Sequence, residues 1–159
     1  MPSSFPSFVL FRFAVLFESL GFQHGDVIHL CIGNHNLTLP LSFGAWILGG
    51  VVSVGDVNLE PRGVAGQLND TAAKIVFCTP DTSNLVKAAV AKSEQGSKVK
   101  AFCLGRSAGE WCEDVYGALE GVGADHCPTP YTPLRPKKEP CVIFWSSGTT
   151  GKKLNWARK

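Results

Sequence analysis

The sequence has almost no excess of charge of either sign. It contains 15 lysine and arginine residues against 13 aspartate and glutamate residues, a formal net charge of +2. This balance argues neither for nor against an anionic partner. The four tryptophans are not interleaved with basic residues in the way that a single-stranded nucleic acid site requires. We therefore expect no nucleic acid partner.

Spacings that bind metals are also missing. None of the six cysteines forms a Cys-x-x-Cys pair, and none has a histidine at zinc-ligand spacing. Several cysteines, such as Cys78 and Cys103, sit inside apolar runs, so we expect buried free thiols in a reducing, intracellular compartment. The histidines are scattered and are interpreted as surface or core residues: His24, His29, His35 and His126. The sequence supports no metal site and no Ser-His-Asp or Cys-His catalytic arrangement.

No apolar run is long enough to span a bilayer. The most apolar stretch, residues 8–17, is interrupted by Arg12, and it lacks both a basic region before it and a small-residue cleavage site after it. We expect neither a signal peptide nor a transmembrane segment. An amphipathic helix that ends at Gly21 is predicted instead. Its apolar face is formed by Phe13, Leu16, Phe17 and Leu20.

Five short apolar runs have the length and the flanking turn residues of β-strands. They cover residues 27–32, 51–54, 75–78, 99–104 and 141–145. Helices are predicted between them at residues 36–48, 64–72, 81–92 and 110–119, with Asp81 or Thr82 as the cap of the third. This alternation predicts βαβ units and therefore an α/β fold with a mainly parallel sheet. Residues 120–140 are rich in glycine and proline and are expected to form a long loop or linker.

One segment carries chemical information. Trp145 ends the last apolar run, and small hydroxyl and glycine residues follow it up to the cation Lys152. Glycines allow successive backbone N–H groups to converge on an anion, while hydroxyl groups and a lysine add donors and charge, so the segment suits a polyphosphate. The alternative is a plain surface turn, because serine, threonine and glycine are common in turns. The segment is not a Walker A loop, because only two residues separate Gly148 and Gly151.

The segment does resemble the signature loop of the AMP-binding, adenylate-forming superfamily, which includes acyl-CoA synthetases, 4-coumarate–CoA ligases and beetle luciferases. That loop reads Ser-Ser-Gly-Thr-Thr-Gly-x-Pro-Lys-Gly, and residues 146–151 match its first six positions. The chain before the loop is similar to the family as well, at residues 20–27, 44–51 and 67–76 and at Asn34. The resemblance covers roughly residues 13–151.

The resemblance implies an ATP-dependent ligase. In the family a carboxylic acid attacks the α-phosphorus of magnesium-bound ATP to give an acyl-adenylate, and coenzyme A then displaces AMP; in luciferases oxygen chemistry follows. The signature loop holds the β- and γ-phosphates, and Ser147, Thr149 and Thr150 are the expected side-chain contacts. The full set of expected nucleotide-binding residues is Ser146, Ser147, Gly148, Thr149, Thr150, Gly151 and Lys152. Family positions for catalysis and for magnesium are not matched in this chain.

The match ends after Gly151. The family continues x-Pro-Lys-Gly, whereas this chain continues Lys152-Lys153-Leu154-Asn155, so Lys152 or Lys153 is the available substitute for the family lysine. Residues 1–151 are therefore expected to form part of an adenylate-forming N-terminal domain, and residues 152–159 a divergent basic tail. We expect the chain alone to be inactive. The alternatives are a non-catalytic truncated product and a weak anion or nucleotide binder. A cytoplasmic or peroxisomal location is expected, although the last three residues are not a Ser-Lys-Leu-type signal.

Overall fold

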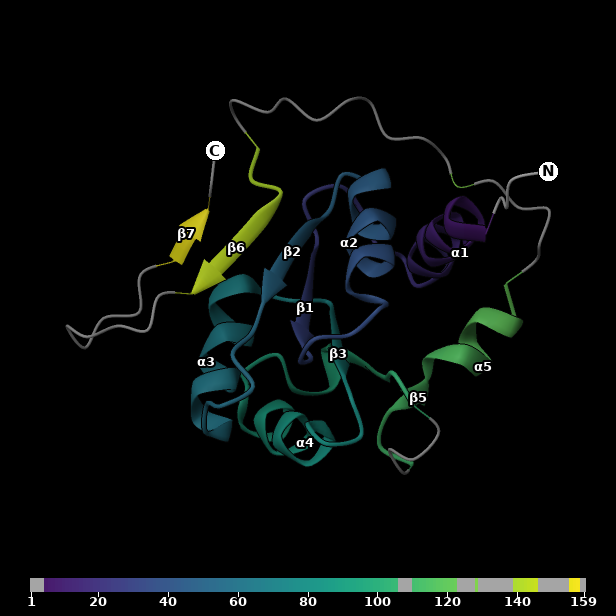
Figure 1. Ribbon diagram of the computed structural model, residues 1–159. Coiled ribbons are helices and arrows are strands. Elements are labelled where there is room, and N and C mark those ends of the chain that lie inside the picture. Colours follow the sequence, from purple (N-terminus) through teal and green to yellow (C-terminus); the bar gives the residue numbers. More distant parts are fainter. Residues whose placement is uncertain (1–4, 106–109, 123–127, 129–138, 146–154, 158–159) are drawn as a thin grey trace.

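The computed structural model describes residues 5–105, 110–122, 128, 139–145 and 155–157. They form an α/β fold around one sheet with the strand order β5-β4-β3-β1-β2-β6-β7 (Figure 1). Neighbouring strands from β5 to β6 are parallel, and β7 pairs antiparallel with β6. The strands are β1 (Val27–Cys31), β2 (Val51–Val54), β3 (Ile75–Cys78), β4 (Lys100–Cys103), β5 (Glu113–Asp114), β6 (Val142–Trp145) and β7 (Asn155–Ala157). The predicted α/β fold with a mainly parallel sheet is confirmed.

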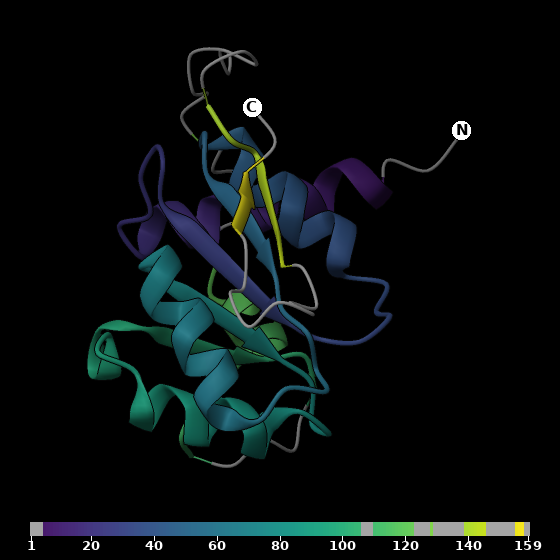
Figure 2. The same cartoon turned by 90° about the vertical axis from the view of Figure 1, so that its left-hand side faces the viewer.

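Helices cover both faces of the sheet. They are α1 (Phe5–Ser19), α2 (Thr38–Ile47), α3 (Pro61–Thr71), α4 (Ser83–Lys92) and α5 (Val115–Glu120), with the short 3-10 turn η1 (Gly96–Lys98) before β4. Helices α1, α2 and α5 lie on one face, and α3 and α4 lie on the other (Figures 1 and 2). Because alternate residues of a strand point to opposite faces, Ile28 and Leu30 of β1 join the core under α1 and α2, while Val27 and Cys31 join the core under α3 and α4.

The first helix buries its predicted apolar face, with one exception. Phe13, Leu16 and Phe17 are buried as expected, but Leu20 is 37% exposed, so its place on the apolar face was wrong. Leu20 lies just past the end of α1, where the chain turns through Gly21 at a φ of +74°. The predicted glycine cap is therefore confirmed. Because α1 already ends at Ser19, Leu20 does not continue its buried face.

Helix α2 crosses α1 at a glycine. A Cβ atom on Gly44 would lie 2.6 Å from the Cβ atom of Phe13 and 3.2 Å from the backbone nitrogen of Ala14. The two helix backbones therefore meet closely at this point. Pro40 is the third residue of α2, where a proline removes no intrahelical hydrogen bond.

Two predicted helices differ in their bounds, and strand β5 was not predicted. The predicted helix over residues 110–119 was wrong, because Asp114 accepts hydrogen bonds from the backbone of Tyr116 and Gly117 and caps a shorter helix that begins at Val115. Residues 113–114 form the added strand β5 instead. Helix α3 begins at Pro61 rather than at Val64, since proline fits the first turn of a helix.

The residue before α4, Thr82, bonds to neighbouring strands instead of capping the helix. Thr82 is the N-cap by position, but its hydroxyl makes no capping bond. It donates instead to the carbonyl oxygen of Cys31 at 2.8 Å and accepts from the backbone of Thr79 at 3.0 Å. This hydroxyl ties together the carboxyl ends of β1 and β3, which fixes that edge of the sheet.

Other predictions concern the thiols, the linker and the membrane. Cys31, Cys78, Cys103, Cys112 and Cys141 are free thiols as expected, and the first three are buried; Cys127 lies outside the described residues. Most of the predicted linker, residues 120–140, and His126 also lie outside them. Among the helices that the structure describes, none combines the length and the apolar character needed to cross a membrane.

Candidate functional site

The carboxyl ends of β1 and β2 form the natural ligand-binding edge of this sheet. From β1 the chain runs to α2 on one face, and from β2 it runs to α3 on the other face. In open parallel sheets a crevice forms where neighbouring strands send their connections to opposite faces, and ligands bind there. The fold alone therefore points to the segments that follow β1, β2 and their neighbour β6.

Strand β6 ends at this edge of the sheet, directly before the predicted phosphate-binding loop in the sequence. It pairs parallel with β2, with Val54 opposite Phe144. Strand β7 then returns antiparallel along β6, with Trp145 opposite Asn155. The segment 146–154 thus starts and ends at two residues that lie side by side near the carboxyl end of β2. The predicted site residues themselves lie outside the described residues: Ser146, Ser147, Gly148, Thr149, Thr150, Gly151 and Lys152.

A buried polar chain leads to Trp145, the last described residue before that segment. The indole Nε1 of Trp145 lies 3.0 Å from the hydroxyl oxygen of Ser53, and this oxygen lies 2.9 Å from Nδ1 of His29. An indole N–H can only donate, so Ser53 accepts the bond from Trp145. Ser53 and His29 are both fully buried. Adjacent strands β1, β2 and β6 therefore supply one residue each to a continuous hydrogen-bonded chain.

His29 is uncharged at neutral pH. Its burial lowers the pKa of the imidazole to about 4, because the protonated ring would have to exist away from water. Nε2 of the ring has no hydrogen-bond partner among the residues that the structure describes. A Cβ atom on Gly55 would lie 2.6 Å from this nitrogen, so only a glycine fits over the ring here. The sequence left open whether His29 is a surface or a core residue, and the structure places it in the core.

A second indole hydrogen bond secures the opposite end of β6. Nε1 of Trp46, on α2, donates to the carbonyl oxygen of Cys141 at 2.9 Å. The same oxygen accepts from the backbone nitrogen of Val52 at 3.0 Å. Strand β6 is only partly buried, and Phe144 is 56% exposed. The two indole groups therefore fix a strand that has little apolar burial of its own.

Sequence reasoning missed the contribution of Ser53 and of the Trp145 side chain. Polar residues in the middle of two apolar strands, His29 and Ser53, were the available signal, because a buried polar group needs a hydrogen-bond partner. Their mutual contact follows from the register, in which His29 is opposite Ser53. The order that places β6 beside β2 is not readable from the spacing of the strands.

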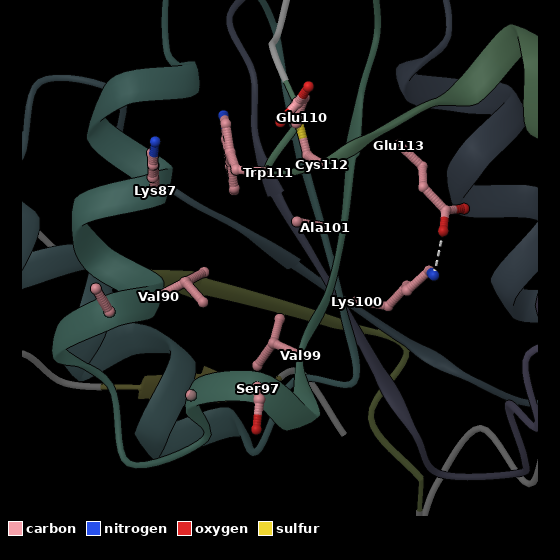
Figure 3. A pocket seen from close by; sticks show the side chains of 12 residues that line it. Lys87, Val90, Ser97, Val99, Lys100, Ala101, Glu110, Trp111, Cys112 and Glu113 are labelled. Atoms are coloured by element: carbon pink, nitrogen blue, oxygen red, sulfur yellow. Dashed lines mark hydrogen bonds and ion pairs between the residues drawn. The ribbon is translucent and has the colours of Figure 1, made fainter.

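A separate cavity lies at the other edge of the sheet. It has a volume of about 480 Å³ and lies between α4 and the segment that leads into β5 (Figure 3). Lys87 and Lys100 line it together with Glu110 and Glu113, and Lys100 is paired with Glu113. Positive and negative side chains balance here, so the cavity does not suit a polyphosphate. Strands β4, β3, β1 and β2 separate it from β6.

No metal site is formed within the described ranges. Among those residues no group of three or more histidine, cysteine, aspartate or glutamate side chains is arranged to hold a metal ion.

The chain matches known proteins along almost its whole length. The family model described as "AMP-binding enzyme" matches residues 10–153. The chain is 25% identical over 137 residues to long-chain fatty acid transport protein 2 of Rattus norvegicus, which covers 86% of this chain and 22% of that protein.

Solved structures share the fold at low sequence identity. The anthranilate CoA ligase AuaEII, solved in complex with anthranoyl-AMP, has a TM-score of 0.81 at 17% identity, over 96% of this chain and 29% of that chain. A long-chain-fatty-acid-CoA ligase from Archaeoglobus fulgidus has a TM-score of 0.76 at 16% identity, over 99% of this chain and 32% of that chain. A fatty acyl CoA synthetase from Mycobacterium tuberculosis has a TM-score of 0.74 at 20% identity, over 99% of this chain and 29% of that chain. The chain thus spans about a fifth to a third of the length of these relatives.

Proposed function

The chain belongs to the AMP-binding enzyme family, and we propose that it forms the part of an ATP-dependent carboxylic acid–CoA ligase that holds the outer phosphates of ATP. The whole reaction would join a carboxylic acid to AMP and then to coenzyme A. In this chain the segment 146–152 would carry the phosphate contacts. The reaction and its substrates are proposed for a protein of the relatives' full length, of which these residues would supply one part.

The positions of the residues on either side of the loop carry the proposal. Segment 146–154 follows Trp145 and precedes Asn155. These two residues are paired with each other at the carboxyl edge of the sheet. This edge lies beside the crevice between β1 and β2, where an α/β sheet binds its ligands. The family match extends to residue 153 and so includes all of this segment except Leu154. Topology and family membership therefore direct attention to the same eight residues, 146–153.

The residue types in the loop explain what it would bind. Gly148 and Gly151 allow the backbone to turn, so that N–H groups converge on an anion. Ser147, Thr149 and Thr150 would add hydroxyl donors, and Lys152 would add positive charge. None of these groups recognises a base. Affinity should consequently follow the number of phosphate groups and be the same for ATP and inorganic triphosphate.

The chain offers no predicted ligands for the magnesium ion that accompanies ATP in this family. The described residues include no ligand group for it, and the sequence matches none of the family's magnesium positions.

Phosphorus-31 NMR tests the proposed function. Inorganic triphosphate, ATP and AMP are each titrated with the 159-residue chain, and the line widths and shifts of the phosphate signals are followed. We expect triphosphate and ATP to bind equally, with dissociation constants near the millimolar range, because a millimolar constant requires about 4 kcal/mol and a few anion contacts of up to about 2 kcal/mol each supply no more. AMP should not bind detectably. Binding of AMP as tight as that of ATP would contradict a site for the outer phosphates.

A further inference from the structure

We infer that Ser53, held by His29, is a positioning residue that sets the start of the 146–152 loop through its hydrogen bond to Trp145. The inference rests on the proposed function, since it concerns the same loop. It adds residues that lie in other strands and do not resemble the loop motif. Ser53 would act on the loop only through Trp145 and would not touch the phosphates itself.

The burial of the three residues is the first observation. Strand β6 is partly exposed along its length, and Trp145 itself is only partly buried. Ser53 and His29, in contrast, are 0% exposed. Ser53 belongs to β2, which pairs with β6, and His29 belongs to β1 on the other side of β2. The hydrogen bond from Trp145 to Ser53 therefore connects a loosely covered strand to the rigid centre of the sheet.

The number of hydrogen bonds around Ser53 is the second observation. Its hydroxyl oxygen lies within hydrogen-bond distance of two ring nitrogens, Nε1 of Trp145 and Nδ1 of His29. Since Trp145 donates, the Ser53 hydroxyl is free to donate to a neutral His29. The hydroxyl is then held in one orientation, with its acceptor lone pair aimed at the indole. A serine without His29 would have other rotamers to occupy.

The place of Trp145 in the chain is the third observation. It is the last residue of β6, and Ser146 follows it directly. A tryptophan ring held at Nε1 fixes the backbone position from which the loop departs. Loops that cradle anions depend on the exact direction of successive N–H groups, so a shift at the first residue changes every later contact.

Proton–nitrogen NMR of the tryptophan side chains tests the inference. The sequence has four tryptophans, so the spectrum of the labelled chain holds four indole signals, which single Trp→Phe variants assign. Inorganic triphosphate is then added. We expect the Trp145 signal to shift in proportion to occupancy while the Trp46 signal stays in place. Trp46 is the matched control, because its indole also bonds to β6 but at Cys141, away from the loop.

Binding measurements on variants complete the test. Trp145→Phe keeps an aromatic ring but removes the pyrrole part of the indole and with it the donor, and we expect triphosphate affinity to fall by about threefold to tenfold. Ser53→Ala should have an effect of the same size, and the double variant should be no weaker than Ser53→Ala alone. Trp46→Phe should leave the affinity unchanged. Two independent structural effects would add in the double variant, which separates positioning from general loss of stability.

The outcomes are distinct. If triphosphate binds the wild-type chain but Ser53→Ala and Trp145→Phe bind it equally well, the inference fails and the proposed function stands. If the wild-type chain binds no triphosphate, the proposed function fails and takes the inference with it. Should Ser53→Ala not fold, Trp145→Phe and the indole signals of the wild-type chain decide the question.

Discussion

Trp46 donates its indole hydrogen to the carbonyl oxygen of Cys141 across 95 positions of sequence, at a distance of 2.9 Å. This contact joins α2 to the residue that precedes β6. It lies on the opposite end of β6 from the bond between Trp145 and Ser53. Both ends of the strand that leads into the candidate loop are therefore held by an indole group.

The first prediction concerns Trp46. Replacing it with phenylalanine removes the donor and leaves most of the ring, so the free energy of unfolding should fall by about 1–2 kcal/mol. Urea denaturation followed by circular dichroism measures this loss. Trp111→Phe is the control, because Trp111 has no indole hydrogen bond within the described part of the chain, and it should cost less. Equal losses for the two variants would show that the bond to Cys141 is not stabilising.

The second prediction concerns the crossing of α1 and α2. Gly44→Ala would place a Cβ atom 2.6 Å from Phe13 Cβ, and relieving such a clash in a packed core costs about 1–3 kcal/mol. Gly66→Ala is the matched control, since Gly66 also lies within a helix and has nothing within 4 Å of the added atom. It should stabilise the chain by about 0.5–1 kcal/mol through helix propensity. Thermal melts of the two variants should shift in opposite directions, and a shift in the same direction would contradict the close crossing.

The third prediction concerns the pH dependence of stability. His29 has a folded pKa of about 4 against an ordinary value of 6.5, so between these values the unfolded chain binds more protons than the folded chain. Stability from the neutral ring is therefore complete above about pH 6.5 and is lost as the pH falls toward 4, by up to about 3 kcal/mol. His29→Gln removes the titration and should flatten the dependence over this window. The same slope in both proteins would show that carboxyl groups, not His29, cause the loss.

The buried apolar strands were easier to predict from the sequence than β5 and β7, the strands at the edges of the sheet. Runs such as residues 75–78 were identified because strands buried on both faces are apolar throughout. Strand β5 was missed because Glu113 and Asp114 are polar and the strand is only two residues long. Strand β7 was missed because residues 155–157 follow the departure from the family motif and were expected to belong to a basic tail.

The site was predictable only in its local part. Segment 146–152 has a composition and a motif that can be read directly from the sequence. The support beneath it joins Trp145 to Ser53 across 92 positions, and no local pattern encodes that pairing. Only the packing of β6 against β2 brings the two residues together, so the support became visible with the sheet order.

The central claim is that the serine and threonine hydroxyls of the loop contribute more to polyphosphate binding than the lysines that follow them. Titration of inorganic triphosphate by NMR against two variants tests it most directly. Thr149→Val/Thr150→Val removes two hydroxyl donors at nearly constant volume, and Lys152→Ala/Lys153→Ala removes two charges while leaving β7 in place. We predict that the threonine variant loses detectable binding, while the lysine variant weakens it by less than about tenfold because exposed charges are screened by salt. Unchanged binding by the threonine variant, together with complete loss in the lysine variant, would contradict the claim.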